Sequence, residues 1–230
     1  MGEIGCLYLV ATPIGNLGDF SPRGNQMLTD CDLIACEDTR VTSKLLSRME
    51  ISKPMVSYRE ENEKKQSVIL SNEILEGKKI ALVSDAGYPG ISDPGFRLVR
   101  ECKKLNIPII PIPGPNAAIT ALAASGLPTH NFLFLGFPPK GKVALINLLK
   151  KWELFEGSLI FYQSRYKMPS TFESLKEAFG EDRYISVARE LTKLHESIET
   201  GPLHMVREKC TLSSQKGEFT LVIAPQGFSF

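Results

Sequence analysis

Residues 80–104 read IALVSDAGYPGISDPGFRLVRECKK. The apolar run Ile80–Ser84 predicts a buried strand, and the amphipathic pattern from Phe96 to Lys104 predicts a helix. The loop between them, residues 84–95, is dense in Gly, Pro and Asp and is longer than a strand-to-helix turn requires. Apolar runs alternate with helix-length patterns in the same way along the whole chain. This alternation predicts α/β layers built on a mainly parallel sheet.

The chain has an expected boundary near its middle, where residues 111–115 read PIPGP. Three prolines stiffen this connection. We therefore expect two α/β domains, residues 1–113 and 114–230. The expected strands of the first are Cys6–Ala11, Leu33–Cys36, Met55–Ser57, Ile80–Ser84 and Pro108–Ile112, with helices Pro22–Thr29, Arg40–Arg48, Glu63–Leu75 and Phe96–Lys104. Those of the second are Phe132–Leu135, Leu159–Tyr162, Tyr184–Ala188, Ser197–Thr200 and Phe219–Ala224, with helices Ala117–Ala124, Val143–Phe155, Pro169–Phe179 and Leu203–Lys209.

Composition excludes several classes of protein. The 230 residues are 43% hydrophobic and carry a net charge of +1, which excludes global disorder and disfavours binding of nucleic acid by bulk electrostatics alone. The five Cys form no C-x-x-C pair, so we expect free thiols in a reducing cytosol rather than disulfides or zinc. The longest apolar stretch, 107–128, is interrupted by five prolines, and the N-terminus lacks a basic signal region. We expect a cytoplasmic protein without a membrane span.

The common sequence motifs of nucleotide-binding proteins and hydrolases are absent or incomplete in this chain. No G-x-G-x-x-G follows the first strand. Residues 136–143 resemble a P-loop, but Val143 replaces the Ser or Thr that holds Mg²⁺, and Pro138 and Pro139 lack the N–H groups of a phosphate cradle. With three His and no H-E-x-x-H or G-x-S-x-G, we expect neither a metal site nor a hydrolase.

Three loops carry polar and small residues where a ligand could lie. They are residues 11–18 (ATPIGNLG), 84–95, and 113–118 (PGPNAA). In open α/β sheets, ligands bind at the carboxyl ends of strands, and Asp85 stands at such an end. We interpret Asp93-Pro94 as a helix N-cap followed by Pro at the first helical position. The first loop can equally be a plain turn in which Ser21-Pro22 starts a helix.

The loops also carry a family resemblance. LYLVATPIGNLGD, LIACEDTR, ALVSDAGYPGISDPGFRLV, IPIIPIPGPNAAITALAASGLP, FLFLGF, ARELTKLHE and KGEFTLVI occur in one order between residues 7 and 223. This resembles the class III, tetrapyrrole-methylase-like methyltransferases. Within them it is most similar to the branch that methylates a cytidine 2′-hydroxyl in the decoding region of 16S rRNA.

The resemblance implies a homodimer of two-domain chains with S-adenosylmethionine in the cleft between the domains and 16S rRNA of the small ribosomal subunit as the partner. The implied cofactor contacts are Pro13, Gly15, Asp85, Ala86, Gly87, Gly90, Ile91, Asn116, Ala117 and Tyr162. Main-chain groups are expected to carry much of this binding, since the loops are rich in Gly and Pro.

Methylation of a ribose hydroxyl needs a positioned acceptor and a group that favours the alkoxide. The candidates lie in CEDTR and ARELTKLHE: Asp38, Arg40, Glu190 and Lys193, with Glu37 and Glu196 beside them. Lys193 could stabilise negative charge, and Asp38 or Glu190 could accept the proton. The alternative is that these residues form ion pairs at a domain or dimer interface.

The chain departs from the family pattern where a substrate would be held. Residues 58–62 read YREEN instead of Tyr-His-x-His-Asn, so Arg59 and Glu61 replace two His, and residues 162–166 read YQSRY instead of Tyr-Glu-Ser-Pro-His, which changes Gln163, Arg165 and Tyr166. The basic run after FLFLGF is reduced to Lys140 and Lys142, and the usual C-terminal extension is missing. Two alternatives therefore remain: a methylase of a small molecule such as a tetrapyrrole, and a cofactor-binding paralogue without activity.

Overall fold

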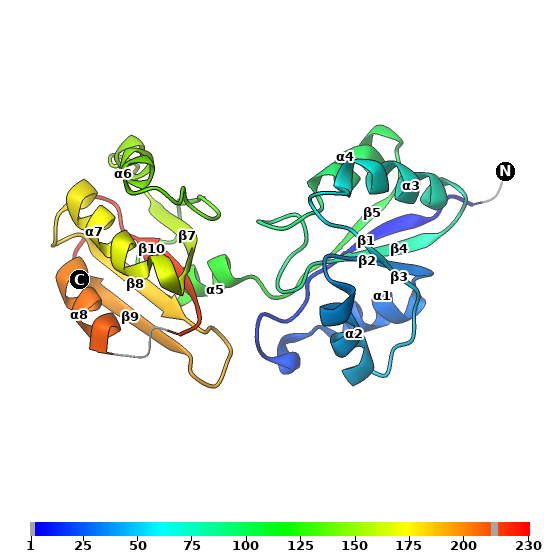
Figure 1. Ribbon diagram of the computed structural model, residues 1–230, viewed down its shortest axis with the longest axis horizontal. Helices are drawn as coiled ribbons and strands as arrows, with labels where there is room; N and C mark the ends of the chain where they lie inside the picture. The colour runs from blue at the N-terminus through cyan, green and yellow to red at the C-terminus, as the bar shows by residue number, and fades with distance from the viewer. Residues whose placement is uncertain (1–2, 213–215) are drawn as a thin grey trace. The chain divides into compact units, whose positions relative to one another are not determined.

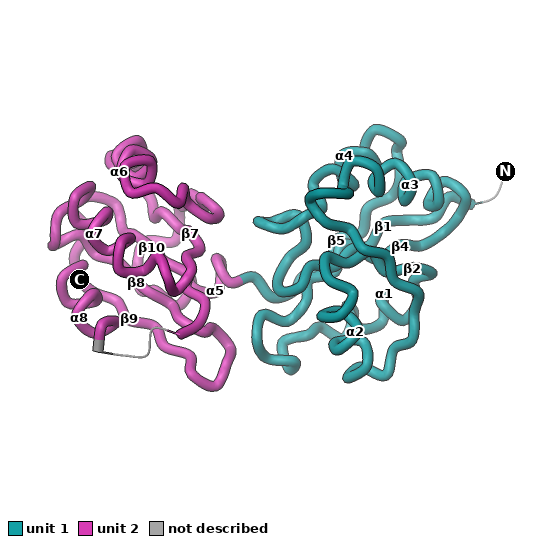
Figure 2. The backbone as a smooth tube through the Cα atoms, viewed as in Figure 1, with its two compact units in different colours: residues 1–116 teal, residues 117–230 magenta. Residues whose placement is uncertain are grey.

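The computed structural model describes residues 3–212 and 216–230. The chain forms two compact units, residues 1–116 and 117–230 (Figure 2). Each unit contains one five-stranded sheet with helices packed on it. The prediction of two α/β domains is thereby confirmed. The sequence places the boundary after residue 113, whereas the compact units divide after Asn116.

The first unit is built on a parallel sheet of strand order β3-β2-β4-β1-β5. The strands are β1 (Cys6–Val10), β2 (Leu33–Cys36), β3 (Met55–Ser57), β4 (Lys79–Val83) and β5 (Ile109–Ile112), and the helices are α1 (Pro22–Asp30), α2 (Thr39–Arg48), α3 (Glu63–Leu75) and α4 (Phe96–Lys104). Helices α1 and α2 cover one face, and α3 and α4 cover the other (Figure 1). Burial on both faces explains why the strands read as continuous apolar runs.

Alternate residues of β1 show how the two faces are filled. Tyr8 and Val10 belong to the core with Leu28 of α1, whereas Leu7 belongs to the core with Leu70 of α3 and Leu98 of α4. Successive side chains of a strand point to opposite faces. One strand therefore contributes to both hydrophobic cores.

Strands β1 and β4 are neighbours in the sheet, but the chain leaves them toward opposite faces. After β1 it enters α1 on one face, and after β4 it enters α4 on the other. Loops that diverge in this way open a crevice at the carboxyl ends of the strands, where ligands of open α/β sheets bind. The loops 11–21 and 84–95 lie at this edge.

The second unit has a mixed sheet of strand order β6-β7-β10-β8-β9. Its strands are β6 (Phe132–Phe134), β7 (Ser158–Ser164), β8 (Tyr184–Arg189), β9 (Ser197–Pro202) and β10 (Glu218–Ile223). Only β6 and β7 pair in parallel among these strands. The prediction of a mainly parallel sheet is wrong for this unit. The connection between β8 and β9 spans only residues 190–196, too few for the crossover that parallel neighbours need.

Helices α6 (Lys142–Lys151), α7 (Met168–Phe179) and α8 (Leu203–Leu212) share one hydrophobic core with this sheet, and α5 (Ala117–Ala124) packs against β7, β8 and β10 (Figure 1). Helix α6 ends at Lys151, before the predicted end at Phe155. Trp152 and Phe155 instead turn onto the core with their rings edge to face, 6.4 Å apart. Two short 3₁₀ helices, η1 (Leu17–Asp19) and η2 (Arg165–Lys167), follow β1 and β7.

The five cysteines are free, as predicted, and four of them are buried. Burial raises the pKa of Cys31, Cys102 and Cys210 to about 11, so these thiols stay protonated and unreactive at neutral pH. Within residues 3–212 and 216–230, no helix combines the length and the apolar character needed to cross a membrane.

The packing of α4 gives a direct test of the first core. We expect Leu98→Ala to lower the free energy of unfolding by about 2–5 kcal/mol, because this side chain is 0% exposed. The matched control on the same helix is Phe96→Ala. Phe96 is 65% exposed, so its removal is expected to cost less than about 1 kcal/mol. Urea denaturation of both variants measures the difference, and equal losses would contradict this assignment of the core.

Candidate functional site

The loops that follow β1 and β4 are joined by a short antiparallel bridge. The N–H of Thr12 donates to the carbonyl of Gly87 at 2.9 Å, and the N–H of Gly87 donates back to Thr12 at 3.1 Å. The Thr12 hydroxyl donates to the Ser84 carbonyl at 3.0 Å, and the Ser84 hydroxyl donates to the Gly87 carbonyl at 3.1 Å. Because Thr12 and Ser84 are both buried, these bonds are shielded from water and fix the two loops against each other.

The loop after β5 reaches the same place. A Cβ at Gly87, whose φ is +90°, would lie 3.6 Å from Cγ2 of Ile14 and 4.0 Å from the carbonyl oxygen of Pro115. A Cβ at Gly114 would lie only 2.8 Å from Cβ of Ala11, so these two backbone segments approach as closely as glycine allows. The structure thus brings all three loops singled out in the sequence together at the carboxyl edge of the first sheet.

Charged residues from β2 and β3 border this edge. The Asp38 N–H donates to Oδ1 of Asp85 at 3.0 Å, which links the ends of β2 and β4. Nε of Arg59 donates to the Glu37 carbonyl at 2.9 Å, which links the ends of β2 and β3. The candidate Asp38 therefore lies beside Asp85, although the two residues are 47 positions apart in sequence.

Asp38 itself is the N-cap of α2. Its carboxylate accepts from the N–H of Arg40 at 2.8 Å and from the Arg40 guanidinium, with Nε 3.0 Å away. The Arg40 hydrogen bonds hold the pKa of Asp38 well below its usual range. A carboxylate so stabilised in its charged form is a poor proton acceptor. The pair caps α2 within the first unit, a structural role other than the interface ion pair considered as the alternative for these two residues.

Three other carboxyl groups near the same loops have raised pKa values. Burial is the main cause for Glu37, Asp85 and Asp93, and each is raised further by another acidic group: Glu37 by Asp85, Asp85 by Asp38, and Asp93 by Glu37. For Asp93 the pKa rises to about 7. Carboxyl groups with raised pKa values in one region are typical of functional sites. No cluster with the composition of a metal site occurs within residues 3–212 and 216–230.

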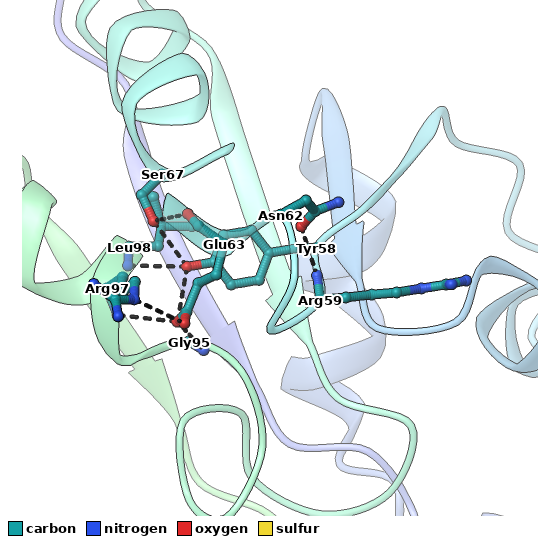
Figure 3. Close-up of polar contacts among 8 residues, drawn as sticks. All are labelled: Tyr58, Arg59, Asn62, Glu63, Ser67, Gly95, Arg97 and Leu98. Atoms are coloured by element: carbon teal, nitrogen blue, oxygen red, sulfur yellow. Dashed lines mark hydrogen bonds and ion pairs between the residues drawn. The ribbon is translucent and has the colours of Figure 1, made fainter. Parts of the chain in front are cut away.

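The interpretation of Asp93 as a helix cap is wrong. Helix α4 begins at Phe96 with Gly95 as N-cap, because positive φ angles at Ser92 (+64°) and Gly95 (+150°) keep the chain out of helical geometry until that point. The carboxylate that caps α4 comes instead from Glu63 of α3. Its Oε1 accepts from the N–H groups of Gly95 at 3.1 Å and Arg97 at 3.2 Å (Figure 3).

Glu63 and Tyr58 form a buried network that fixes the end of the 84–95 loop. The Tyr58 hydroxyl lies 3.1 Å from Oε1 of Glu63 and 2.9 Å from Oγ of Ser67, and it accepts from the N–H of Leu98 at 3.1 Å (Figure 3). Nε of Arg97 completes the network with an ion pair to Oε2 of Glu63 at 3.3 Å. The sequence analysis missed this role. No pattern in the sequence marked Glu63 as core-facing, because the apolar residues of helix 63–75 share no single face: Leu70 is buried, whereas Val68 and Ile69 are exposed.

The departures at residues 58–62 now have structural positions. Tyr58 is buried, and Asn62 closes the turn by accepting from the Arg59 N–H at 2.8 Å and donating to the Ser57 carbonyl at 3.0 Å. Arg59 and Glu61, the two positions that depart from the expected pattern, are exposed, as is Glu60 between them. The turn is thus retained while its surface chemistry changes.

In the second unit, Glu190 and Lys193 lie in the connection between β8 and β9. Nζ of Lys193 lies 2.9 Å from Oε1 of Glu190 and 2.8 Å from Oε2 of Glu218, and Oε1 of Glu190 also accepts from the Glu218 N–H at 3.0 Å. Burial of Glu190 works against ionisation, but these hydrogen bonds outweigh it and lower its pKa. The pKa of Lys193 is raised in spite of its burial, because Glu218 and Glu190 hold its ammonium. These ion pairs lie within the second unit, so they differ from the domain or dimer interface pairs considered as the alternative to direct chemistry.

The remaining candidates divide between the two units. Gly90 and Ile91 lie in the outer half of the 84–95 loop, where the Gly90 N–H donates to the Pro94 carbonyl at 3.2 Å. Ala117 is the first residue of α5. Tyr162 lies on β7 with its ring edge to face with Phe134 at 5.0 Å and Phe137 at 5.4 Å. Roles for these residues stay predictions.

Sequence comparison gives consistent matches along the chain. The profile of the family described as Tetrapyrrole (Corrin/Porphyrin) Methylases matches residues 6–206. A protein of Halalkalibacterium halodurans named ribosomal RNA small subunit methyltransferase I is 45% identical over 223 residues, which cover 97% of this chain and 77% of that protein. Proteins of the same name from Synechocystis and Escherichia coli O157:H7 are 46% and 43% identical, covering 96% and 95% of this chain and 79% and 77% of their own lengths.

Solved structures show the same fold at low sequence identity. A cobalt precorrin-4 methyltransferase matches with a TM-score of 0.70 at 15% identity, covering 95% of this chain and 94% of its own. The methyltransferase CobJ matches with a TM-score of 0.70 at 18% identity, covering 98% and 96%. The fold of this chain is therefore shared with these structures.

The Glu63 network predicts a local effect on the 84–95 loop. Glu63→Gln removes the charge that four groups share, and we expect it to lower the free energy of unfolding by about 1–3 kcal/mol. Amide hydrogen exchange at Gly95, Arg97 and Leu98 should accelerate. The matched control is Glu60→Gln, an exposed neighbour, with an expected effect within about 0.5 kcal/mol. Unchanged exchange at these three amides would contradict the capping role.

The raised pKa of Asp93 predicts a dependence of stability on pH. Its pKa is about 7 in the folded chain against an ordinary value of 3.8, so the folded state binds the proton more tightly and stability falls as pH rises from about 4 to 7. At pH 4 we expect Asp93→Asn and the unmodified protein to have the same free energy of unfolding. At pH 8 the variant should be more stable by about 1–2 kcal/mol, a value reduced for the solvent that reaches this half-buried side chain. A difference in unfolding free energy that is equal at both pH values would contradict this.

Proposed function

Because the chain belongs to the tetrapyrrole (corrin/porphyrin) methylase family, we propose that it transfers a methyl group from S-adenosylmethionine to a ribose 2′-hydroxyl of a cytidine in the decoding region of 16S rRNA. The observation that carries this proposal is the match to relatives named ribosomal RNA small subunit methyltransferase I, at 43–46% identity over 95–97% of the chain. The 2′-oxygen and the cytidine are the proposal's own detail, beyond what those names say.

S-adenosylmethionine is the methyl donor of this family's methyltransferases. When bound, it supplies an activated methyl group on a positively charged sulfonium. The edge of the first sheet suits such a molecule in two respects. The missing side chain at Gly87 leaves space between Ile14 and Pro115, and the 84–95 loop presents main-chain groups at the carboxyl ends of strands.

The charge of this edge also favours a cationic ligand. Burial raises the pKa values of Asp85 and Glu37, and a neighbouring acidic group raises each further, Asp38 for Asp85 and Asp85 for Glu37. A positive charge placed beside them relieves both costs. Pro13, Gly15, Asp85, Ala86, Gly87 and Asn116 are the cofactor contacts that we propose within the first unit, with Gly90 and Ile91 in the outer part of the loop.

For the acceptor hydroxyl, Glu37 is a better proton acceptor than Asp38. The pKa of Glu37 is raised by burial and by the charge of Asp85, which brings it closer to the pH at which general bases act. Asp38 has a lowered pKa and caps α2. We therefore propose that Glu37 is the general base that accepts the proton of the ribose hydroxyl. Asp38 and Arg40 would position the segment that carries Glu37. Glu190 and Lys193 form an ion pair that holds the connection between β8 and β9 against β10.

We further propose that the small ribosomal subunit is the substrate, that the enzyme acts in the cytoplasm, and that it is a homodimer. The net charge of +1 supports recognition of a folded ribonucleoprotein by shape, since RNA held by bulk charge alone would need a more basic chain.

The function is tested by methyl transfer in vitro. Purified protein is mixed with labelled S-adenosylmethionine and small subunits from a strain that lacks the gene. We expect label in one ribose of 16S rRNA. Glu37→Gln should lower kcat by about 100-fold or more with little change in the Kd for S-adenosylmethionine. The matched control is the adjacent Asp38→Asn, which keeps a good N-cap and should retain kcat within about threefold.

Two outcomes would contradict the proposal in different ways. Label in small metabolites, with ribosomal subunits unlabelled, would assign the chain to small-molecule methylation. Binding of S-adenosylmethionine without transfer to any acceptor would make it a non-catalytic relative. If Asp38→Asn lost most of its kcat while Glu37→Gln stayed active, Asp38 and not Glu37 would be the general base.

A further inference from the structure

The second unit contains a groove that no role described above uses. It lies between the loop of residues 137–142, the end of β7 and the first turns of α7, and it has a volume of about 230 Å³. We call it the basic groove, because Lys140, Lys142 and Lys167 line it and no acidic residue does.

The positive charge of the basic groove is only partly neutralised. Lys142 pairs with Glu177 of α7 at 2.9 Å, with both side chains more than half exposed. In the described ranges 3–212 and 216–230, Lys140 and Lys167 form no ion pair within 4.0 Å. Two lysines of the groove, one from the 137–142 loop and one from η2, are therefore available to an anion.

One aromatic side chain, Phe137, lines the basic groove, and a second, Tyr166, directly precedes Lys167 in the sequence. Phe137 is 64% exposed although it is apolar, and its ring stands edge to face with Tyr162 at 5.4 Å. Next to Lys167, the Tyr166 ring is 77% exposed and carries the Arg165 guanidinium over its face at 4.4 Å. Exposed flat rings among basic side chains are the pattern by which proteins hold single-stranded nucleic acid, with bases stacked on rings and phosphates beside cations.

The buried polar side chains that line the basic groove already have hydrogen-bond partners within the protein. Nε2 of Gln163 donates to the Thr171 hydroxyl at 2.8 Å, and Oε1 of Gln163 accepts from the Ser164 N–H at 2.9 Å. The Ser174 hydroxyl donates to the Ser170 carbonyl at 2.9 Å. Because these polar groups are already hydrogen-bonded to one another, a small polar metabolite finds few partners there. A ligand gains mainly from charge and stacking.

We propose that the basic groove binds the single-stranded backbone of the RNA substrate, with phosphates at Lys140 and Lys167 and one base on Phe137. The inference rests on the proposed function, since it gives the substrate of that reaction a second contact on the second unit. The groove positions RNA without reading its sequence. The acceptor nucleotide is bound elsewhere.

Binding of a fluorescein-labelled, mixed-sequence single-stranded RNA, measured by anisotropy at several salt concentrations, tests the groove. For Lys140→Ala/Lys167→Ala we expect about tenfold weaker binding, and a slope of log K against log salt that is smaller by about 1.4, or 0.7 per phosphate. The matched control is Lys103→Ala/Lys150→Ala, which removes the same charge at two exposed sites outside the groove and should keep the slope. Phe137→Ala should weaken binding about tenfold. Its control, Leu154→Ala, removes an 80% exposed apolar side chain and should not.

The outcomes separate this inference from the proposed function. If wild-type protein methylates small subunits while the groove and control variants bind RNA alike, the groove inference is overturned and the function stands. If the groove variants lose RNA affinity while wild-type protein methylates no RNA, the groove stands and the function is overturned. If polyglutamate competes as well as RNA and Phe137→Ala has no effect, the groove is a general anion surface and the RNA assignment is overturned.

Discussion

The pair of backbone hydrogen bonds between Thr12 and Gly87 is the constraint on which the rest of the first unit depends. It joins the ends of β1 and β4, two neighbouring strands from which the chain departs toward opposite faces of the sheet. Divergent loops would otherwise leave an open crevice with no fixed geometry. The bridge fixes the geometry of one side of that crevice, and glycine at position 87 allows the φ of +90° that the chain adopts there.

The 84–95 loop, which this bridge holds at one end, is stabilised by hydrogen bonds at its other end and contains carboxyl groups whose charged forms are unfavourable. Glu63, the first residue of α3, and Tyr58, in the turn before that helix, accept from N–H groups at the start of α4. Between the two anchored ends, Asp85 and Asp93 are carboxyl groups that burial disfavours in their charged form. Local features that lower stability and persist in an otherwise well-packed fold are expected at functional sites. A bound cation reverses that cost at Asp85, which connects the energetics of the loop to its proposed ligand.

The sequence was sufficient to predict the positions of the strands, but not the contacts between residues far apart in the chain. Apolar runs and Gly or Pro boundaries predicted every named strand within two residues at each end, because burial on both faces leaves a strong local pattern. The Glu63 cap joins residues 32 positions apart, and no local pattern encodes such a contact. Asp93-Pro94 resembled a cap because the signal ignores the positive φ of Gly95. The antiparallel pairing of β8 and β9 follows from the short connection of residues 190–196. The length of that connection can be read from the predicted strands, but it was not used to predict the strand direction.

The two units carry different kinds of surface. Acidic side chains border the carboxyl edge of the first sheet, whereas three lysines and the exposed ring of Phe137 line the groove of the second. The central claim is that the loops 11–16 and 84–95 hold the methyl donor. The most direct measurement is hydrogen–deuterium exchange of the whole protein with and without S-adenosylhomocysteine. We expect slower exchange at the amides of residues 14–16, 85–88, 90 and 91. Binding of the compound with exchange unchanged in both loops would contradict it.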